Sequence, residues 1–87
     1  MKGLVALVTG AGSGLGRATA ENFIKNGAKV LLCDLPTSNG NNVAKELGEN
    51  ATFFPVNVTS EDDVKKALQE TKLKFGKLNV LVNCAGT

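Results

Sequence analysis

The chain contains no histidine, no tyrosine and no tryptophan, and only two of its 87 residues are cysteine. Two thiols without any histidine make at most half of a typical zinc site, so no metal-binding residue is predicted. Cys33 and Cys84 each follow an apolar run, and this placement favours free cysteines that pack as small hydrophobic residues over a disulfide framework.

Long apolar runs and a strong charge of one sign are also missing. No stretch approaches the roughly 20 apolar residues that cross a bilayer, so no membrane span is predicted. The net charge of +2, with lysines scattered along the chain, does not favour a nucleic-acid or anionic-membrane surface. The first apolar run begins at Leu4 and leads directly into a glycine-rich segment, which leaves no room for a signal peptide. A targeting segment upstream is not excluded.

What the sequence does contain is a regular alternation of apolar runs and helical patterns. Strands are predicted over residues 3–9, 28–34, 51–58 and 78–83, and helices over residues 14–27, 41–48 and 59–76. The order βαβαβαβ predicts an α/β fold, the N-terminal half of a doubly wound Rossmann fold, with a parallel sheet and helices on both faces. Residues 1–87 are accordingly interpreted as one partial dinucleotide-binding domain.

Two local signals refine this prediction. Pro55 cannot donate to a strand ladder, so the third strand is expected at a sheet edge. In the third helix, Thr59 or Ser60 is the expected N-cap, the adjacent Asp62 and Asp63 suit the positive helix start, and a glycine ends it. Its expected inward stripe is Val64, Ala67, Leu68, Thr71 and Phe75.

The segment Val8–Gly16, "VTGAGSGLG", joins the first strand to the first helix. Unpaired backbone amides and the positive helix end at such a turn attract phosphate, and side chains would keep the phosphate out. The spacing is Thr9-Gly10, three residues, Gly14, one residue, Gly16; it matches neither the strict dinucleotide fingerprint nor a lysine phosphate loop. A tight turn without any ligand is the alternative.

Asp34 ends the second strand, where a carboxylate can accept both ribose hydroxyls of an adenine nucleotide. The same charge would repel a 2′-phosphate and Leu35 offers no basic partner, so NAD is favoured over NADP. A solvated turn residue is the competing interpretation. Arg17 is expected to be solvated or packed rather than to bind phosphate.

Two more motifs stand at strand ends, and ligands bind beyond the carboxyl ends of parallel strands. Asn57 is expected to contact the edge of the adenine ring, and Val58 to offer an apolar wall beside it. In "NCAG", Asn83 is expected to tie loops together, while Cys84, Ala85 and Gly86 let the backbone approach the ribose. If the first strand lies between the second and the fourth, the two cysteines are about 9–10 Å apart, beyond the roughly 7 Å limit for a disulfide.

Taken in order, the glycine segment, Asp34, the end of the third strand and "NCAG" resemble the short-chain dehydrogenase/reductase family, and finer features resemble a mitochondrial, NAD-dependent branch of it. The resemblance implies a homotetramer, a mitochondrial location, with a cytoplasmic location as the alternative, and, for a full-length relative, a partner role in RNA processing. It also implies cofactor contacts at Ser13, Leu15, Asp34, Asn57, Val58 and Cys84. The family usually carries aspartate in place of Asn57, so the charge at this contact is lost.

In that family a serine, a tyrosine and a lysine carry proton transfer, and this chain has no tyrosine, so no catalytic residue is assigned. The expected parent enzyme moves hydride between NAD and a secondary alcohol or ketone, such as a 3-hydroxyacyl-CoA or a hydroxysteroid. The alternative is a non-catalytic nucleotide-binding or interaction module, whose fourth strand would be an exposed edge that invites self-association. A methyltransferase is a third interpretation, but an acidic residue would then be expected where Thr9 stands.

Overall fold

The computed structural model describes residues 3–10, 14–36, 40–57 and 60–83. Strands and helices alternate in the order β1 (Val5–Thr9), α1 (Gly14–Lys25), β2 (Lys29–Asp34), α2 (Gly40–Leu47), β3 (Ala51–Pro55), α3 (Glu61–Phe75) and β4 (Val80–Asn83). All strand pairs are parallel, and the sheet order is β3-β2-β1-β4. The predicted α/β class and element order are confirmed, and β1 lies between β2 and β4. No helix in the described ranges has the length and apolar character needed to cross a bilayer.

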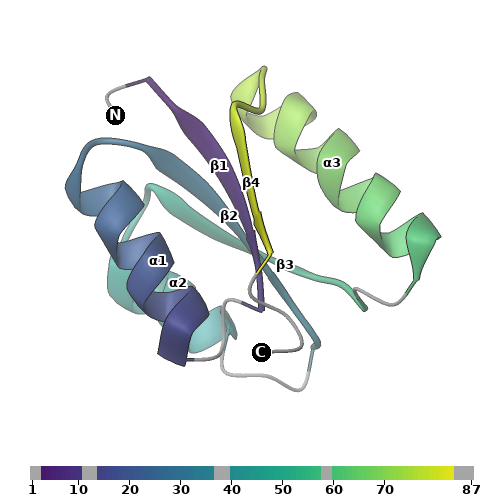
Figure 1. The fold of residues 1–87 in the computed structure, drawn as a ribbon, viewed down its shortest axis with the longest axis horizontal. Helices are drawn as coiled ribbons and strands as arrows, with labels where there is room; N and C mark the ends of the chain where they lie inside the picture. Colours follow the sequence, from purple (N-terminus) through teal and green to yellow (C-terminus); the bar gives the residue numbers. More distant parts are fainter. Residues whose placement is uncertain (1–2, 11–13, 37–39, 58–59, 84–87) are drawn as a thin grey trace.

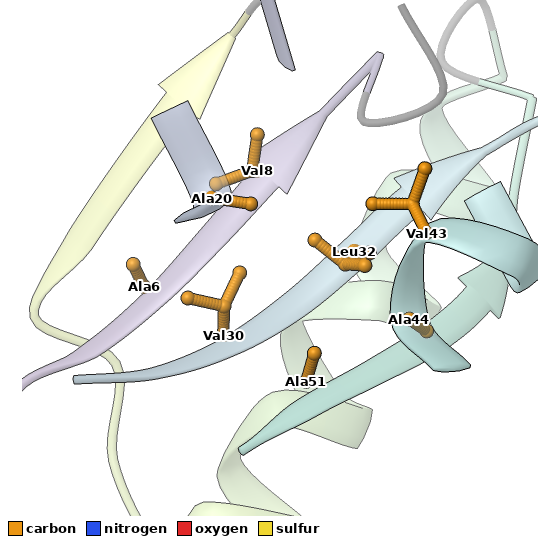
Figure 2. Close-up of a cluster of buried hydrophobic side chains, with 8 residues drawn as sticks. All are labelled: Ala6, Val8, Ala20, Val30, Leu32, Val43, Ala44 and Ala51. Atoms are coloured by element: carbon orange, nitrogen blue, oxygen red, sulfur yellow. The ribbon is translucent and has the colours of Figure 1, made fainter. Parts of the chain in front are cut away.

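The sheet is covered on both faces, as predicted, with α1 and α2 on one side and α3 on the other (Figure 1). On the α1/α2 side, alternate residues of β1 and β2 meet small and branched side chains of the helices (Figure 2). This cluster consists of Ala6, Val8, Ala20, Val30, Leu32, Val43, Ala44 and Ala51.

The α3 side uses the intervening strand residues. Leu7, Leu31 and Cys33 of β1 and β2 pack with Val56 and Ala67 in a second buried cluster. Because both faces of the two central strands are buried, nearly every residue of β1 and β2 must be apolar. This burial explains why their sequences are continuous apolar runs.

β3 lies at a sheet edge, which confirms the interpretation of Pro55. The strand ends at Pro55 rather than continuing to residue 58 as predicted. The backbone N–H of Val56 still donates to the Asp34 carbonyl at 2.8 Å, whereas that of Asn57 turns away and donates to the Asp63 carboxylate at 2.9 Å. The amide of Asn57 lies on the outer side of this edge strand, and its bond to Asp63 links the end of β3 to the first turn of α3. Val58 itself lies outside the described residues.

α3 begins and ends where its sequence signals predict. Ser60 is the N-cap, and its hydroxyl accepts from the Asp63 amide. Gly76 closes the helix in the left-handed conformation (φ 81°), donating its N–H to the Lys72 carbonyl. Ala67 and Thr71 are buried on the predicted inward stripe.

β4 begins at Val80 rather than at residue 78, because Asn79 makes a different contact. Its side-chain Oδ1 accepts from the Val5 amide at 2.9 Å, and its own amide donates to the Val5 carbonyl at 2.9 Å. This reciprocal pair fixes the register of β4 on β1, two strands that are far apart in the sequence.

The sequence of α1 places two sets of residues at helical spacing, Leu15, Thr19 and Phe23 and then Ala20 and Ile24, which predicts an inward face. Ala20 is buried and Phe23 and Ile24 pack against the core, whereas Leu15 is 56% exposed. The buried residues of the helix are Gly16 and Ala20. Residues this small let the start of α1 approach the sheet closely, and this approach leaves the larger Leu15 outside the core.

Candidate functional site

The carboxyl ends of the four strands lie together at one edge of the sheet. Thr9 stands opposite Cys33 of β2 and Asn83 of β4, and Asp34 stands opposite Pro55 of β3. α1 and α2 both begin at this same edge (Figure 1). In open α/β sheets such an edge is the usual place for a ligand.

Gly10 directly follows β1, and Gly14 is the first residue of α1. Gly10 has φ +67°, a left-handed conformation that side chains with a Cβ rarely adopt. A Cβ built on Gly14, the first residue of α1, would meet no atom within 4 Å. The first turn of the helix therefore borders open space, and its leading amides have no partner within the helix itself. Ser13, predicted in this turn, lies outside the described residues.

The next two residues of α1 face opposite environments. Gly16 is buried, and Leu15 presents most of its side chain outward at the same helix end. A glycine at the buried position allows close helix–sheet packing, and an exposed leucine beside the turn can cover an apolar part of a ligand. Both placements fit a phosphate-binding helix start.

Asp34 is the last residue of β2 and is half-buried. Its Oδ1 accepts from the Leu35 amide at 2.8 Å, which orients the carboxylate at the strand end. The neighbouring Cys33 thiol is fully buried; desolvation, with a smaller contribution from the Asp34 charge, raises its pKa from 9.0 to about 12. The thiol is therefore protonated at neutral pH and supplies no nucleophile.

On the β3 side, Asn57 is exposed and its backbone is held at both ends. Its N–H donates to Asp63 Oδ2 at 2.9 Å, and its carbonyl accepts from the Ser60 amide at 2.9 Å. The sequence assigned Asp63 only to the helix start, so this contact was missed. The spacing Ser60-x-x-Asp63, which resembles a capping box, was the available signal.

On the β4 side, Asn83 joins two strand ends, a role similar to the one predicted for it. The Thr9 hydroxyl donates to Asn83 Oδ1 at 2.8 Å. Thr9 was not among the predicted site residues, although a threonine at the end of an otherwise apolar run marks it. Cys84, Ala85 and Gly86 lie outside the described residues.

Arg17 forms a bridge between α1 and α2, pairing with Glu21 at 2.8 Å and with Glu46. The hydrogen bond with Glu21, followed by the charge of Glu46, raises the arginine pKa. The guanidinium is thus engaged with two carboxylates on the helix surface. The described ranges hold no group of three potential metal ligands from histidine, cysteine, aspartate and glutamate.

Comparison with known proteins adds family information to this geometry. Residues 4–87 match the sequence model of the family described as short chain dehydrogenase. The chain is 63% identical over 87 residues to 3-hydroxyacyl-CoA dehydrogenase type-2 of Drosophila melanogaster, and 56% identical over 86 residues to the human protein of that name. These alignments cover 100% and 99% of this chain, but only 34% and 33% of the relatives. The chain spans about a third of the length of these curated relatives.

Solved structures with the same arrangement of strands and helices include a reductase and a dehydrogenase. A 3-ketoacyl-(acyl-carrier-protein) reductase from Brucella melitensis, complexed with NADH, superposes with a TM-score of 0.87 at 41% identity, covering 92% of this chain and 33% of that one. A hydroxysteroid dehydrogenase from Escherichia coli gives a TM-score of 0.91 at 35% identity, covering 99% and 38%. The fold is therefore that of a Rossmann-type reductase.

Proposed function

The chain belongs to the short-chain dehydrogenase family, and we propose that it forms the NAD-binding part of an oxidoreductase that acts on a secondary alcohol or ketone. The observation that carries this proposal is the juxtaposition at the carboxyl edge: a glycine turn with a left-handed Gly10 opens α1, and Asp34 ends the adjacent strand β2. These are the two features that pyrophosphate and an adjoining ribose require.

Each part of the edge has a separate role in holding the dinucleotide. The start of α1 at Gly14, which borders open space, provides the backbone amides and the positive helix end for the pyrophosphate, and the buried Gly16 lets this helix start approach the sheet. Asp34 accepts from the ribose hydroxyls, and Asn57 stands where the adenine amino group can donate to its side-chain oxygen. Ser13, Leu15, Val58, Asn83 and the segment of residues 84–86 complete the proposed contact set.

NAD rather than NADP is the proposed cofactor. The Asp34 carboxylate would repel a 2′-phosphate, and the next residue, Leu35, carries no positive charge to compensate. Arg17, the nearest cation of α1 to the turn, is already paired with two glutamates. The NADH present in the Brucella melitensis reductase supports the same cofactor class. When bound, NAD would supply the hydride acceptor; the residues described here bind and orient it.

For the substrate, the names of the relatives point to a 3-hydroxyacyl-CoA, with a hydroxysteroid as the other class. The sequence contains no tyrosine, the residue expected to transfer the proton in this family. We therefore assign cofactor binding, and no catalytic step, to the 87 residues themselves. A mitochondrial location and a tetrameric parent enzyme are proposed on the family resemblance alone.

A non-catalytic nucleotide-binding or interaction module is the second candidate. The absence of tyrosine and histidine favours it, and β4, at the edge of the four-stranded sheet, offers an interaction surface. The two candidates share the NAD site and assign no turnover to these 87 residues; they differ in whether the parent protein oxidises a substrate. Purified chain incubated with NAD and a 3-hydroxyacyl-CoA should yield no NADH; measurable NADH formation would contradict the assignment of binding alone.

Calorimetric titration tests the binding site. We expect NAD to bind, NADP to bind more weakly and S-adenosylmethionine not to bind. Asp34→Ala should weaken NAD affinity about tenfold by removing a charge-assisted contact and should reduce the preference for NAD over NADP. Asp62→Ala, which removes an exposed carboxylate from the first turn of α3, is the matched control. Equal affinity of the wild-type chain for NAD and NADP would contradict the role of Asp34.

A further inference from the structure

We infer that Asp63 is a positioning residue for the adenine end of the site, acting through the backbone of Asn57. The inference rests on the proposed NAD site and adds a residue that makes no contact with the ligand itself. Asp63 lies in the first turn of α3, and its Oδ2 accepts from the Asn57 amide at 2.9 Å.

The Asn57–Asp63 contact lies where the chain leaves β3 and leads into α3. The preceding amide, that of Val56, still donates to the Asp34 carbonyl at 2.8 Å, and Val56 is buried under the sheet. The Asn57 amide faces the outer side of β3, as alternate amides of an edge strand do, and Asp63 accepts from it there. Asp63 thus ties the residue that follows the last β2 contact of β3 to the first turn of α3, and this tie positions Asn57 at the strand end.

Further contacts hold Asp63 in this orientation. Its own amide donates to the Ser60 hydroxyl at 3.4 Å, and the Ser60 amide donates to the Asn57 carbonyl at 2.9 Å. The residues Asn57, Ser60 and Asp63 therefore form a closed loop of three hydrogen bonds. These hydrogen bonds connect the end of β3 to the first turn of α3.

The two neighbouring acids separate this role from simple helix stabilisation. Glu61 and Asp62 share the first turn of α3 and favour the positive helix end in the same way as Asp63, yet both are exposed. If Asp63 acted only on the helix, substituting Asp62 should change NAD affinity as much as substituting Asp63. If Asp63 positions Asn57, only the substitution of Asp63 should lower the affinity.

The experiment is a double-mutant cycle on NAD affinity, measured by calorimetry with thermal unfolding recorded for every variant. The variants are Asp63→Asn, Asn57→Ala, the combination of the two, and Asp62→Asn as the control with the same change in charge. We expect Asp63→Asn to weaken NAD binding about fivefold, by loss of the charge-assisted hydrogen bond that orients the strand end. In the Asn57→Ala background the same change should alter affinity by less than about twofold, because coupled residues are not additive. Asp62→Asn should leave affinity unchanged.

The outcomes separate the inference from the proposed site. Equal losses of affinity for Asp63→Asn in both backgrounds, or equal losses for Asp63→Asn and Asp62→Asn, would overturn the positioning role while leaving the NAD site intact. A wild-type chain that does not bind NAD would overturn the proposed function itself. If Asp63→Asn lowers the unfolding temperature too far for titration, Asp63→Glu keeps the charge and shifts the carboxylate; it should weaken NAD binding and retain stability, and unchanged affinity would refute the inference.

Discussion

At the scale of single residues, the two positions beside each other at the end of β2 have opposite properties. Asp34 is half-buried at the carboxyl edge, where its carboxylate is available for the proposed contact with the ribose hydroxyls. Cys33 points into the α3-side cluster and has no exposed surface. Burial outweighs the Asp34 charge as the cause of the raised thiol pKa, about 12. Strand alternation thus places a charged ligand group and an inert thiol on consecutive residues.

The raised pKa of Cys33 predicts a loss of stability in alkali. The thiol ionises near 9.0 when unfolded and near 12 when folded, so between these values the unfolded chain loses a proton that the folded chain retains. The free energy of unfolding should fall over this range, by up to about 1.4 kcal/mol per pH unit from this group. Below pH 9 its contribution should be constant.

Denaturant unfolding at pH 7, 9 and 10.5 measures this effect, with Cys33→Ala as the control that removes it. In a Cys84→Ala background, Cys33 should also resist alkylation at pH 8 until denaturant is added. Rapid alkylation of the native chain, or equal alkaline destabilisation of the Cys33→Ala variant, would contradict a buried thiol.

At the scale of elements, the capping residues Ser60 and Gly76 set where α3 begins and ends, rather than its apolar stripe. Ser60→Ala should lower the free energy of unfolding by about 1 kcal/mol, because the Asp63 amide loses its acceptor. Gln69→Ala, a substitution at an exposed position in the middle of the same helix, should leave the free energy of unfolding unchanged or raise it slightly. Urea denaturation compares the two; equal effects would show that the cap contributes nothing.

The identity and order of the elements could be predicted from the sequence because each signal is local. Apolar runs, Pro55 at an edge and Gly76 at a helix end depend on neighbouring residues alone. The end of β3 could not be predicted because both backbone groups of Asn57 bond to residues at the start of α3, and such contacts between elements are not visible in the local sequence. Leu15 was misplaced on α1 because its exposure depends on how closely Gly16 lets the helix approach the sheet.

The candidate site was predictable to the same extent. Gly10 and Asp34 follow from strand ends and glycine spacing, both visible in the sequence. The roles of Thr9 and Asp63 needed the fold, since each bonds to a partner on another element. Residues that hold a ligand can thus be inferred from local chemistry, whereas residues that hold other site residues require tertiary contacts.

At the scale of the whole molecule, the two faces of β4 are covered unequally. Val80 and Val82 pack against the α1/α2-side cluster, whereas Leu81, on the opposite face, is 56% exposed because α3 packs against β1 and β2. β4 is also at the end of the sheet order, with β1 as its neighbour. An apolar edge strand of this kind promotes pairing with another chain.

The 87-residue polypeptide, expressed by itself, should therefore self-associate through β4. Leu81→Lys should shift it towards monomer in sedimentation velocity runs at equal concentration. Leu73→Lys is the matched control, since Leu73 is even more exposed (82%) but stands alone on α3. A wild-type chain that is monomeric at every concentration tested would contradict this use of β4, as would equal effects of both substitutions.

The pairing of Val5 with Asn79, 74 positions apart, has a consequence for synthesis on the ribosome. β1 precedes β4 by this distance in the chain, yet β4 closes one of its long sides. At about 5–20 residues per second, the ribosome needs roughly 4–15 s to produce the residues in between. For that interval β1 has one unpaired edge, and an apolar strand with an unpaired edge is prone to pair with other chains.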